Sequence, residues 1–248
     1  MHPIASGLCS ICGERLFSPH ALSVNQDDGG PRCGLCSRVE PPFARAVAYG
    51  SFDGRLRELI HLLKYALVLP AANVLGRMLA EATVDLDFNL ASGPVLVVPV
   101  PLHRKRLRQR EFNHAELIAR AAIKIGAASG RFSLCSSVLE RKRETSSQTG
   151  LTSSQRRENV RGAFAVSRPD IVKGREVLVV DDVYTTGATV SECARVLRRA
   201  GASQVWVATV ARTLKAQEPR LEIKLPDDQT EVEAELTNEN AVAGGVGG

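Results

Sequence analysis

The spacing of hydrophobic residues changes near Pro94 and divides the chain into two regions. Before Pro94 the pattern predicts a short strand at 46–49, a turn at 52–54 and an amphipathic helix after it. The apolar face of that helix recurs every three or four positions, at Leu56, Leu59, Ile60, Leu63 and Leu67. A further helix is predicted from about Ala71 to Ala82.

After Pro94, strands and helices alternate. Apolar runs of strand length, suited to burial on both faces, lie at Val95–Val100 and Val177–Val180, and a third strand is predicted at Val205–Val210. Helices are predicted at Ala115–Ile125 and at Val190–Ala200, where Gly201 ends the second. Strands that alternate with helices predict an α/β fold, a parallel sheet flanked by helices.

Three other regions lack a clear hydrophobic period. Residues 1–40 are rich in Gly, Pro and Cys, and Pro41 and Pro42 separate them from the rest of the chain. Residues 140–162 are polar and basic, which predicts a loop that is either a functional lid or disordered. The segment from 217 is acidic and is predicted to be flexible. The expected domains are therefore 1–40, 41–216 and a tail at 217–248.

Charge is distributed unevenly along the 248 residues, whose net charge is +5. Residues 217–248 contain eight acidic and two basic residues, whereas residues 103–161 contain fourteen Lys and Arg against five Glu. A field of that sign favours a polyanionic ligand, although a solvated basic surface fits as well. No apolar run approaches the roughly 18 residues of a membrane helix, and no secretory signal is evident, so a soluble cytoplasmic protein is expected.

Four of the six cysteines form two CxxC pairs near the N-terminus. Cys9, Cys12, Cys33 and Cys36 have the spacing of a zinc ribbon, in which each pair presents two thiolates to one tetrahedral ion. A closed, structural Zn²⁺ site is predicted, with a redox dithiol pair as the competing interpretation. In so short a segment the metal would supply most of the folding free energy.

The most informative segment is Val177–Thr189, which reads VLVVDDVYTTGAT. Asp181 and Asp182 follow an apolar strand, at the sheet end where α/β proteins bind ligands. Small and hydroxylated residues then lead into a helix, whose N-terminus favours a phosphate, while the two carboxylates suit a vicinal diol. An ordinary strand end with a threonine helix cap is the alternative. The proposed loop residues are Val183, Tyr184, Thr185, Thr186, Gly187, Ala188 and Thr189.

Basic residues cluster at two other places. Pro99 and Pro101 stiffen the turn after a buried strand, and Arg104 and Lys105 are the favoured pyrophosphate ligands among the arginines and lysine that come next. In the polar loop the candidates are Arg141, Lys142 and Arg143. His103 and His114 flank the first cluster, and neither is expected to be catalytic, because no carboxylate partner is recognisable.

Residues 177–189 resemble the phosphoribosyl pyrophosphate (PRPP) signature of the type I phosphoribosyltransferases, and residues 9–212 resemble the ComF family. Further family-like features are the CxxC pairs, Leu62–Tyr65, 98–115 and 148–164. The resemblance implies that Asp181 and Asp182 bind the ribose hydroxyls, that Thr185–Thr189 bind the 5′-phosphate and that Val98–Lys105 hold the pyrophosphate. It also implies Mg²⁺ with PRPP, an acceptor-binding hood at 43–92 and a mobile loop at 140–162. One departure is Glu111, where the family usually has Gly.

Two functions are therefore expected. The first is a phosphoribosyltransferase, with Asp181, Asp182, Arg104 and Lys105 as candidate catalytic residues, an unidentified acceptor and pyrophosphate as product. The second is a non-catalytic accessory of DNA uptake that senses a ligand and contacts single-stranded DNA or a competence helicase. The intact acids and Thr/Gly loop argue against a third interpretation, a zinc-ribbon transcription factor with a decayed enzyme domain.

Overall fold

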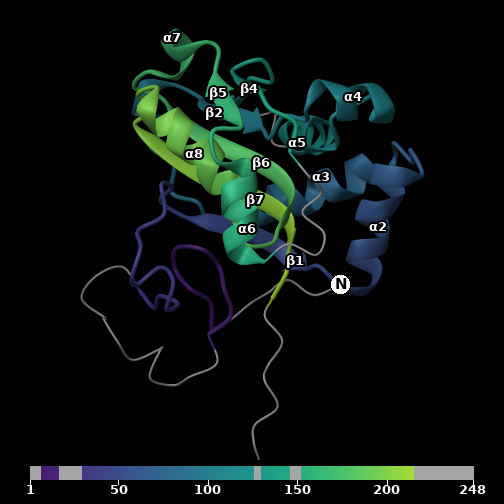
Figure 1. Cartoon of the computed structure of the whole chain (residues 1–248), viewed down its shortest axis with the longest axis horizontal. Coiled ribbons are helices and arrows are strands. Elements are labelled where there is room, and N and C mark those ends of the chain that lie inside the picture. Colours follow the sequence, from purple (N-terminus) through teal and green to yellow (C-terminus); the bar gives the residue numbers. More distant parts are fainter. Residues whose placement is uncertain (1–6, 17–29, 126–129, 146–151, 215–248) are drawn as a thin grey trace, which may run out of the picture. The chain divides into compact units, whose positions relative to one another are not determined.

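The structure is a computed structural model that describes residues 7–16, 30–125, 130–145 and 152–214 (Figure 1). The predicted acidic tail at 217–248 and residues 146–151 of the predicted basic loop lie outside these ranges. No helix in the described ranges is long and apolar enough to span a membrane.

The centre of the fold is a parallel sheet of five strands, which confirms the predicted α/β class. Across the sheet, neighbouring strands follow the order β1-β7-β6-β2-β3, and every pair in it is parallel. The strands are β1 (Ala46–Ser51), β2 (Val95–Pro99), β3 (Phe132–Leu134), β6 (Glu176–Tyr184) and β7 (Gln204–Arg212). Four residues of β6 continue past Val180, which pairs with Pro99 at the end of β2, so they overhang that strand.

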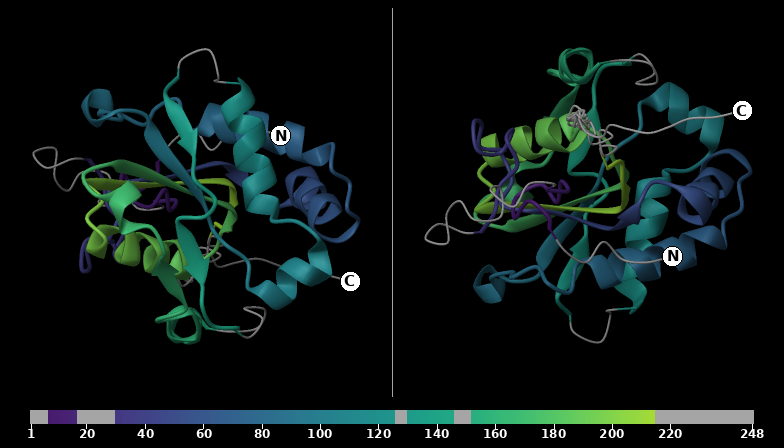
Figure 2. Two further views of the ribbon diagram at one scale, coloured as in Figure 1. Left: turned by 90° about the horizontal axis from the view of Figure 1, so that it is seen from above. Right: turned by 90° about the horizontal axis from the view of Figure 1, so that it is seen from below.

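Helices cover both faces of the sheet, as Figure 2 shows. Because side chains alternate along a strand, Val177 and Val179 of β6 belong to one hydrophobic cluster while Leu178 and Val180 belong to the other. The second cluster includes α2 (Gly54–Tyr65), α3 (Ala71–Ala82) and α5 (His114–Ile125). The first includes α8 (Ala188–Arg199), α6 (Ser153–Val160) and the antiparallel pair β4 (Leu139–Arg141) and β5 (Phe164–Val166). Burial on both faces explains why these strands are continuously apolar.

The strand order reverses between β2 and β6. After β2 the chain passes through α5 to β3, whereas after β6 it passes through α8 to β7 on the other side. The two connections leave the sheet in opposite directions, and α5 and α8 belong to the two different hydrophobic clusters. A crevice forms at such a switch point, beyond the carboxyl ends of the strands, and it is where ligands bind in this class of fold.

Several local predictions were wrong. The first helix ends at Tyr65, because Leu67 takes a positive φ of 55° and is exposed. The predicted loop at 140–162 contains the end of β4 and the whole of α6, whose start is a capping box between Thr152 and Gln155. The basic residues after the second proline form a helix, α4 (Arg104–Arg110), and not an extended turn. Two short elements complete the fold, the 3₁₀ turn η1 (Leu90–Ser92) and α7 (Pro169–Val172).

The contact between α3 and α5 depends on Gly76. A Cβ atom at this position would lie 2.4 Å from Cβ of Ala121 and 2.8 Å from the backbone nitrogen of Ala122. We expect Gly76→Ala to lower the free energy of unfolding by about 1 to 3 kcal/mol, since overpacking outweighs the better helix propensity of alanine. Urea denaturation checks this. The matched control Asn73→Ala, at an exposed position of α3, should leave stability unchanged or raise it slightly, and equal effects would contradict the prediction.

Candidate functional site

A pocket of about 390 Å³ lies at the switch point, beyond the carboxyl ends of β2 and β6. Its walls come from six helices and strands (α2, α4, α5, β4, β6 and α8), from the segment after β2 and from the segment that joins β6 to α8. The lining residues are Lys64, Tyr65, Val100, Leu102, Arg106, Gln109, Arg110, His114, Arg141, Asp181, Asp182, Val183, Tyr184, Thr185, Gly187, Ala188, Thr189 and Val190. Residues far apart in the sequence thus converge on the segment that the sequence singled out.

The segment after β6 forms a turn that exposes a helix N-terminus to the pocket. Gly187 is the N-cap of α8 with a φ of +75°, a conformation that glycine adopts without strain. Among the described residues no side chain caps this helix, so its dipole and first N–H groups suit an anion. The hydroxyl of Thr186 is buried and has no hydrogen-bond partner among the described residues. A phosphate in the pocket would satisfy the N–H groups of the helix, whereas Thr186 does not itself line the pocket.

Asp182 is the buried counterion of two basic side chains. Its carboxylate forms an ion pair with Nζ of Lys64 from α2, and its Oδ2 lies 3.1 Å from Nε2 of His114 from α5. Burial opposes ionisation, but the positive charges of Lys64 and His114 outweigh it and hold the pKa of Asp182 well below its ordinary value. Asp182 is therefore ionised, and it ties α2 and α5 to the end of β6.

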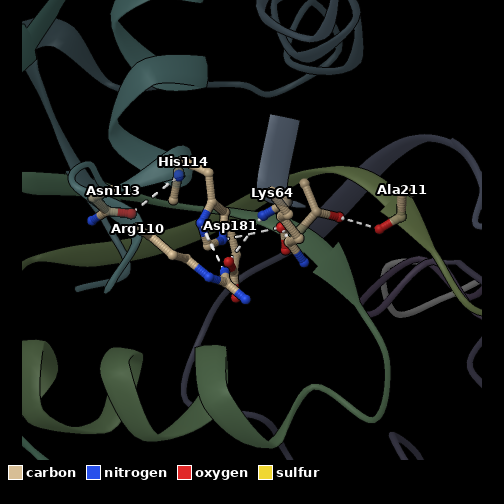
Figure 3. Close-up of polar contacts among 9 residues, drawn as sticks. Lys64, Arg110, Asn113, His114, Asp181 and Ala211 are labelled. Carbon is tan, nitrogen blue, oxygen red and sulfur yellow. Dashed lines mark hydrogen bonds and ion pairs between the residues drawn. The ribbon is translucent and has the colours of Figure 1, made fainter. Parts of the chain in front are cut away.

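Asp181 has the opposite electrostatic environment. Burial and the adjacent charge of Asp182 raise the pKa of Asp181 to about 6, although His114 and Lys64 partly offset this. Its Oδ1 accepts a hydrogen bond of 2.9 Å from the backbone N–H of Asp182. Figure 3 shows Asp181 beside Lys64, His114 and Arg110. The two neighbouring acids thus differ in protonation behaviour near neutral pH.

Three arginines line the pocket. Arg106 and Arg110 stand one turn apart on α4, and Arg141 extends from β4. Arg106 and Arg141 both donate to Thr145, whose backbone carbonyl and hydroxyl accept, and the guanidinium of Arg110 lies 5.3 Å from the ring centroid of Tyr65. Burial, and then the charge of Arg106, lower the pKa of Arg141.

The other sequence-predicted cations lie elsewhere. Arg104 and Lys105 are exposed at the start of α4, where Lys105 pairs with Glu144 at 3.5 Å. Lys142 pairs with Glu140 at 2.7 Å, and Arg143 donates to the backbone carbonyls of Asn159 and Arg161. None of these four residues lines the pocket. Arg106 and Arg110 are four positions apart and therefore lie on one face of α4. A helix predicted at 104–110 would have indicated that they point in the same direction.

Besides Arg106 and Arg110, two further pocket residues, Lys64 and His114, were not predicted from the sequence. The carboxylate partner of His114 was not recognisable in the sequence, because Asp182 lies 68 positions away in the chain and only the fold brings the two together. The preceding residue, Asn113, fixes the start of α5: its amide donates to the carbonyl of Val100 at 3.0 Å, and its Oδ1 accepts from the N–H of Ala115. No sequence signal marks Lys64 apart from its place in a family-like tetrapeptide.

Glu111, the departure from the family pattern, takes a backbone conformation that favours glycine. Glu111 ends α4 with a φ of 64°, the left-handed conformation that favours glycine, and its side chain is exposed. For a residue with a Cβ atom this conformation costs about 1 kcal/mol or more. The added negative charge therefore points to solvent, and Glu111 is absent from the pocket lining.

The four cysteines form a compact group. Their sulfur atoms all lie within 4.8 Å of one another, and those of Cys12 and Cys33 are 3.7 Å apart. Ligands of a tetrahedral zinc ion with Zn–S bonds of about 2.3 Å would be about 3.8 Å apart, so the thiols fit that ion. Contacts with Cys12 and Cys9, together with burial, raise the pKa of Cys36 far above its ordinary value, and a divalent cation would remove this barrier to ionisation.

A second group that could hold a cation consists of His114, Asp181 and Asp182, whose ligand atoms also lie within 4.8 Å of one another. Carboxylate oxygens suit Mg²⁺. The ammonium group of Lys64, however, is already paired with Asp182 and contributes a competing positive charge. This group therefore fits Mg²⁺ less well than the thiols fit zinc.

Residues 119–240 match the family model described as a phosphoribosyl transferase domain. DNA utilization protein YhgH of Escherichia coli K12 is 32% identical over 221 residues, which cover 84% of this chain and 91% of that protein. Competence protein F of Haemophilus influenzae is 30% identical over 219 residues, 86% of this chain and 93% of that protein. The B. subtilis glutamine PRPP amidotransferase structure is 25% identical over 56% of this chain and 26% of its own, with a TM-score of 0.34, too low to carry an argument.

The alignments with these relatives cover more than four-fifths of this chain and more than nine-tenths of each relative. The relatives, the matched domain and the parallel sheet all indicate the same family. The chain therefore belongs to the ComF family of competence-associated, phosphoribosyltransferase-like proteins.

Proposed function

We propose that the pocket binds PRPP together with Mg²⁺ and that the protein is a phosphoribosyltransferase. The observation that carries this proposal is the convergence of two carboxylates, an uncapped helix N-terminus and three arginines on one pocket. The 5′-phosphate would sit on Thr185–Thr189, where backbone N–H groups and hydroxyls point at an anion. The pyrophosphate would lie toward Arg106, Arg110 and Arg141, whose guanidinium groups suit its oxygens.

In this proposal the two acids have different tasks. Asp182 is already committed to Lys64 and His114, so it mainly fixes the geometry of the site, whereas Asp181 has accepting capacity for ribose hydroxyls. A pKa of about 6 leaves Asp181 mostly ionised at pH 7, in a position where the hydroxyls would replace solvent. Lys64 lines the same pocket, so its positive charge would also lie close to the ligand.

Transfer would occur by displacement of pyrophosphate at the anomeric carbon. The described residues contribute positioning and charge neutralisation, which are the main terms when the leaving group is anionic. Mg²⁺ bound to ligand oxygens would neutralise further charge. Pyrophosphate release that depends on an added acceptor would support turnover, and PRPP binding without release across a broad acceptor panel would favour a sensor.

A second candidate function is contact with single-stranded DNA. Arg104, Lys105 and Arg108 are exposed on α4, outside the pocket, and they present a basic face to a polyanion. Two relatives carry names that refer to DNA utilization and competence. Both functions can coexist, because the exposed arginines and the pocket arginines occupy different positions of the same helix.

The different environments of the two acids predict opposite effects of one substitution on stability. The pKa of Asp181 is raised from 3.8 to about 6 on folding, so stability falls as pH rises through this window, and ionised Asp181 destabilises the fold above it. At pH 8 we expect Asp181→Asn to raise the free energy of unfolding by about 1 to 3 kcal/mol. The gain should vanish near pH 4.

Asp182→Asn is the matched comparison. It leaves the buried ammonium group of Lys64 without its carboxylate partner and removes the acceptor of His114, and it should lower the free energy of unfolding by about 3 kcal/mol. Urea denaturation of both variants at pH 8 and pH 4 measures these effects. Destabilisation of similar size in both variants at pH 8 would contradict the assignment.

Ligand binding should separate the pocket cations from the surface cations. Calorimetry with Mg²⁺–PRPP should show affinity reduced about 10- to 100-fold in Asp181→Asn and in Arg106→Gln, because each loses a hydrogen bond to a charged group. The control Arg108→Gln, an exposed position on the same helix as Arg106, should bind as the wild type does. Since Asp181→Asn is expected to be stable, its loss of affinity cannot reflect unfolding. Unchanged affinity in this variant would reject the proposed site.

DNA contact has a separate signature. Binding of a single-stranded oligonucleotide should weaken steeply with salt, and the triple variant Arg104→Gln, Lys105→Gln, Arg108→Gln should reduce both the affinity and the salt slope. Fluorescence anisotropy over a range of salt concentrations measures both. Binding that is absent at low salt, or a triple variant that behaves as the wild type, would remove this candidate.

A further inference from the structure

Arg212 is a buried arginine that joins the cysteine segment to the sheet. It ends β7 and is only 3% exposed. Its Nη1 donates to the backbone carbonyl of Cys12, and its Nη2 donates to Oε2 of Glu14 at 2.9 Å. Two of the acceptors of this buried cation therefore come from the turn at the first CxxC pair.

The same guanidinium group packs on a residue of the proposed PRPP segment. The Cζ atom of Arg212 lies 4.6 Å from the ring centroid of Tyr184, its neighbour across the parallel pair of β6 and β7. A cation over a buried ring is held there by the quadrupole of the ring as well as by packing. Tyr184, Cys9, Cys12 and Cys36 also belong to one hydrophobic cluster.

Tyr184 in turn supports the phosphate loop. A Cβ atom built on Gly187 would lie 2.2 Å from Oη of Tyr184 and 2.5 Å from its Cζ, so the phenol lies directly against the glycine. Gly187 is the N-cap of α8, and its positive φ orients the first turn of that helix. A chain of contacts therefore runs from Cys12 and Glu14 to Arg212, from Arg212 to Tyr184, and from Tyr184 to Gly187.

We propose that the four-cysteine module positions the phosphate loop Thr185–Thr189 through Arg212 and Tyr184, and that metal binding is thereby coupled to ligand binding at the loop. The ligand part of this inference rests on the function proposed above. Zinc would fix the turn that holds the acceptors of Arg212, since Cys9 and Cys12 are predicted zinc ligands and Glu14 lies two positions after Cys12. Without that turn the buried cation lacks a carboxylate and must move, and it would release the ring beneath Gly187.

Tyr184 and Arg212 are positioning residues in this account, since their role is to hold the loop and not to contact the reacting atoms. The coupling should be reciprocal. If zinc raises the affinity for PRPP by some factor, PRPP must raise the affinity for zinc by the same factor. Coupling between two sites is commonly worth a factor of about 5 or more.

The first experiment needs no ligand. Hydrogen exchange of the backbone amides of 185–189 is measured on the full chain, zinc-loaded and after chelation, together with the zinc content of each sample. We expect exchange about 5- to 10-fold faster after chelation, and a similar change in zinc-loaded Glu14→Ala, which removes the carboxylate acceptor of Arg212 but no cysteine. The control Arg15→Gln, an exposed neighbour in the same turn, should exchange as the wild type does.

A further variant keeps the test decisive if Glu14→Ala loses its zinc. Arg212→Lys retains the charge but loses the fork that holds Cys12 and Glu14 at once, so its loop should also exchange faster with zinc bound. Loop exchange that is unaffected by chelation and by Arg212→Lys would overturn the proposal. A purified chain that contains no zinc yet shows a slowly exchanging loop would also overturn it.

The second experiment measures the reciprocal effect. Zinc affinity is determined by chelator competition with and without about 1 mM Mg²⁺–PRPP, and we expect it to be about 5- to 10-fold higher with PRPP in the wild type and unchanged in Arg212→Lys. If the wild type binds no PRPP, the proposed function fails, while the exchange experiment still decides whether the module positions the loop. PRPP binding with a zinc affinity that does not respond would overturn the coupling alone.

Discussion

Asp182 carries a negative charge in the interior of the protein, and the site is organised around that charge. A buried carboxylate is unfavourable unless cations and hydrogen-bond donors compensate it, and here Lys64 from α2 and His114 from α5 do so. The same pairing fixes the ends of two helices from one face of the sheet at the end of β6. Burial, together with the ionised state of Asp182, then raises the pKa of Asp181 and leaves that residue as the adaptable carboxyl of the pocket.

The sheet topology determines where this charge can lie. β6 extends beyond the end of β2, so its last residues protrude into the crevice where the strand order reverses. Helix α8 starts there with a glycine N-cap, and α4 brings Arg106 and Arg110 from the opposite side of the crevice. Two carboxylates, the positive end of a helix dipole and three arginines therefore lie around one pocket. This arrangement suits a ligand that carries both hydroxyls and phosphates.

The cysteine segment is part of the same arrangement. Three of its cysteines share a hydrophobic cluster with Tyr184 and Ala188, and its turn accepts hydrogen bonds from buried Arg212. A metal-binding module that only extended the chain toward a partner would not need a buried arginine between itself and the phosphate loop. The position of Arg212 thus connects the four-cysteine segment with the segment Thr185–Thr189.

The sequence by itself determined the fold class, the three central strands and the segment, 177–189, that lies at the pocket. Apolar runs can report burial on both faces, and a strand followed by acids, threonines and glycine is a local pattern. It also determined the pairing of CxxC motifs, because ligand spacing is local. The predicted roles of Arg104 and Lys105 depended on a segment being a turn, and helical geometry turned Arg106 and Arg110 to the pocket instead. Only the tertiary structure decided the partners of Asp182 and the contact of Arg212 with both Glu14 and Tyr184. Those interactions join residues up to 198 positions apart, and their energies depend on burial, which no local pattern of residues specifies.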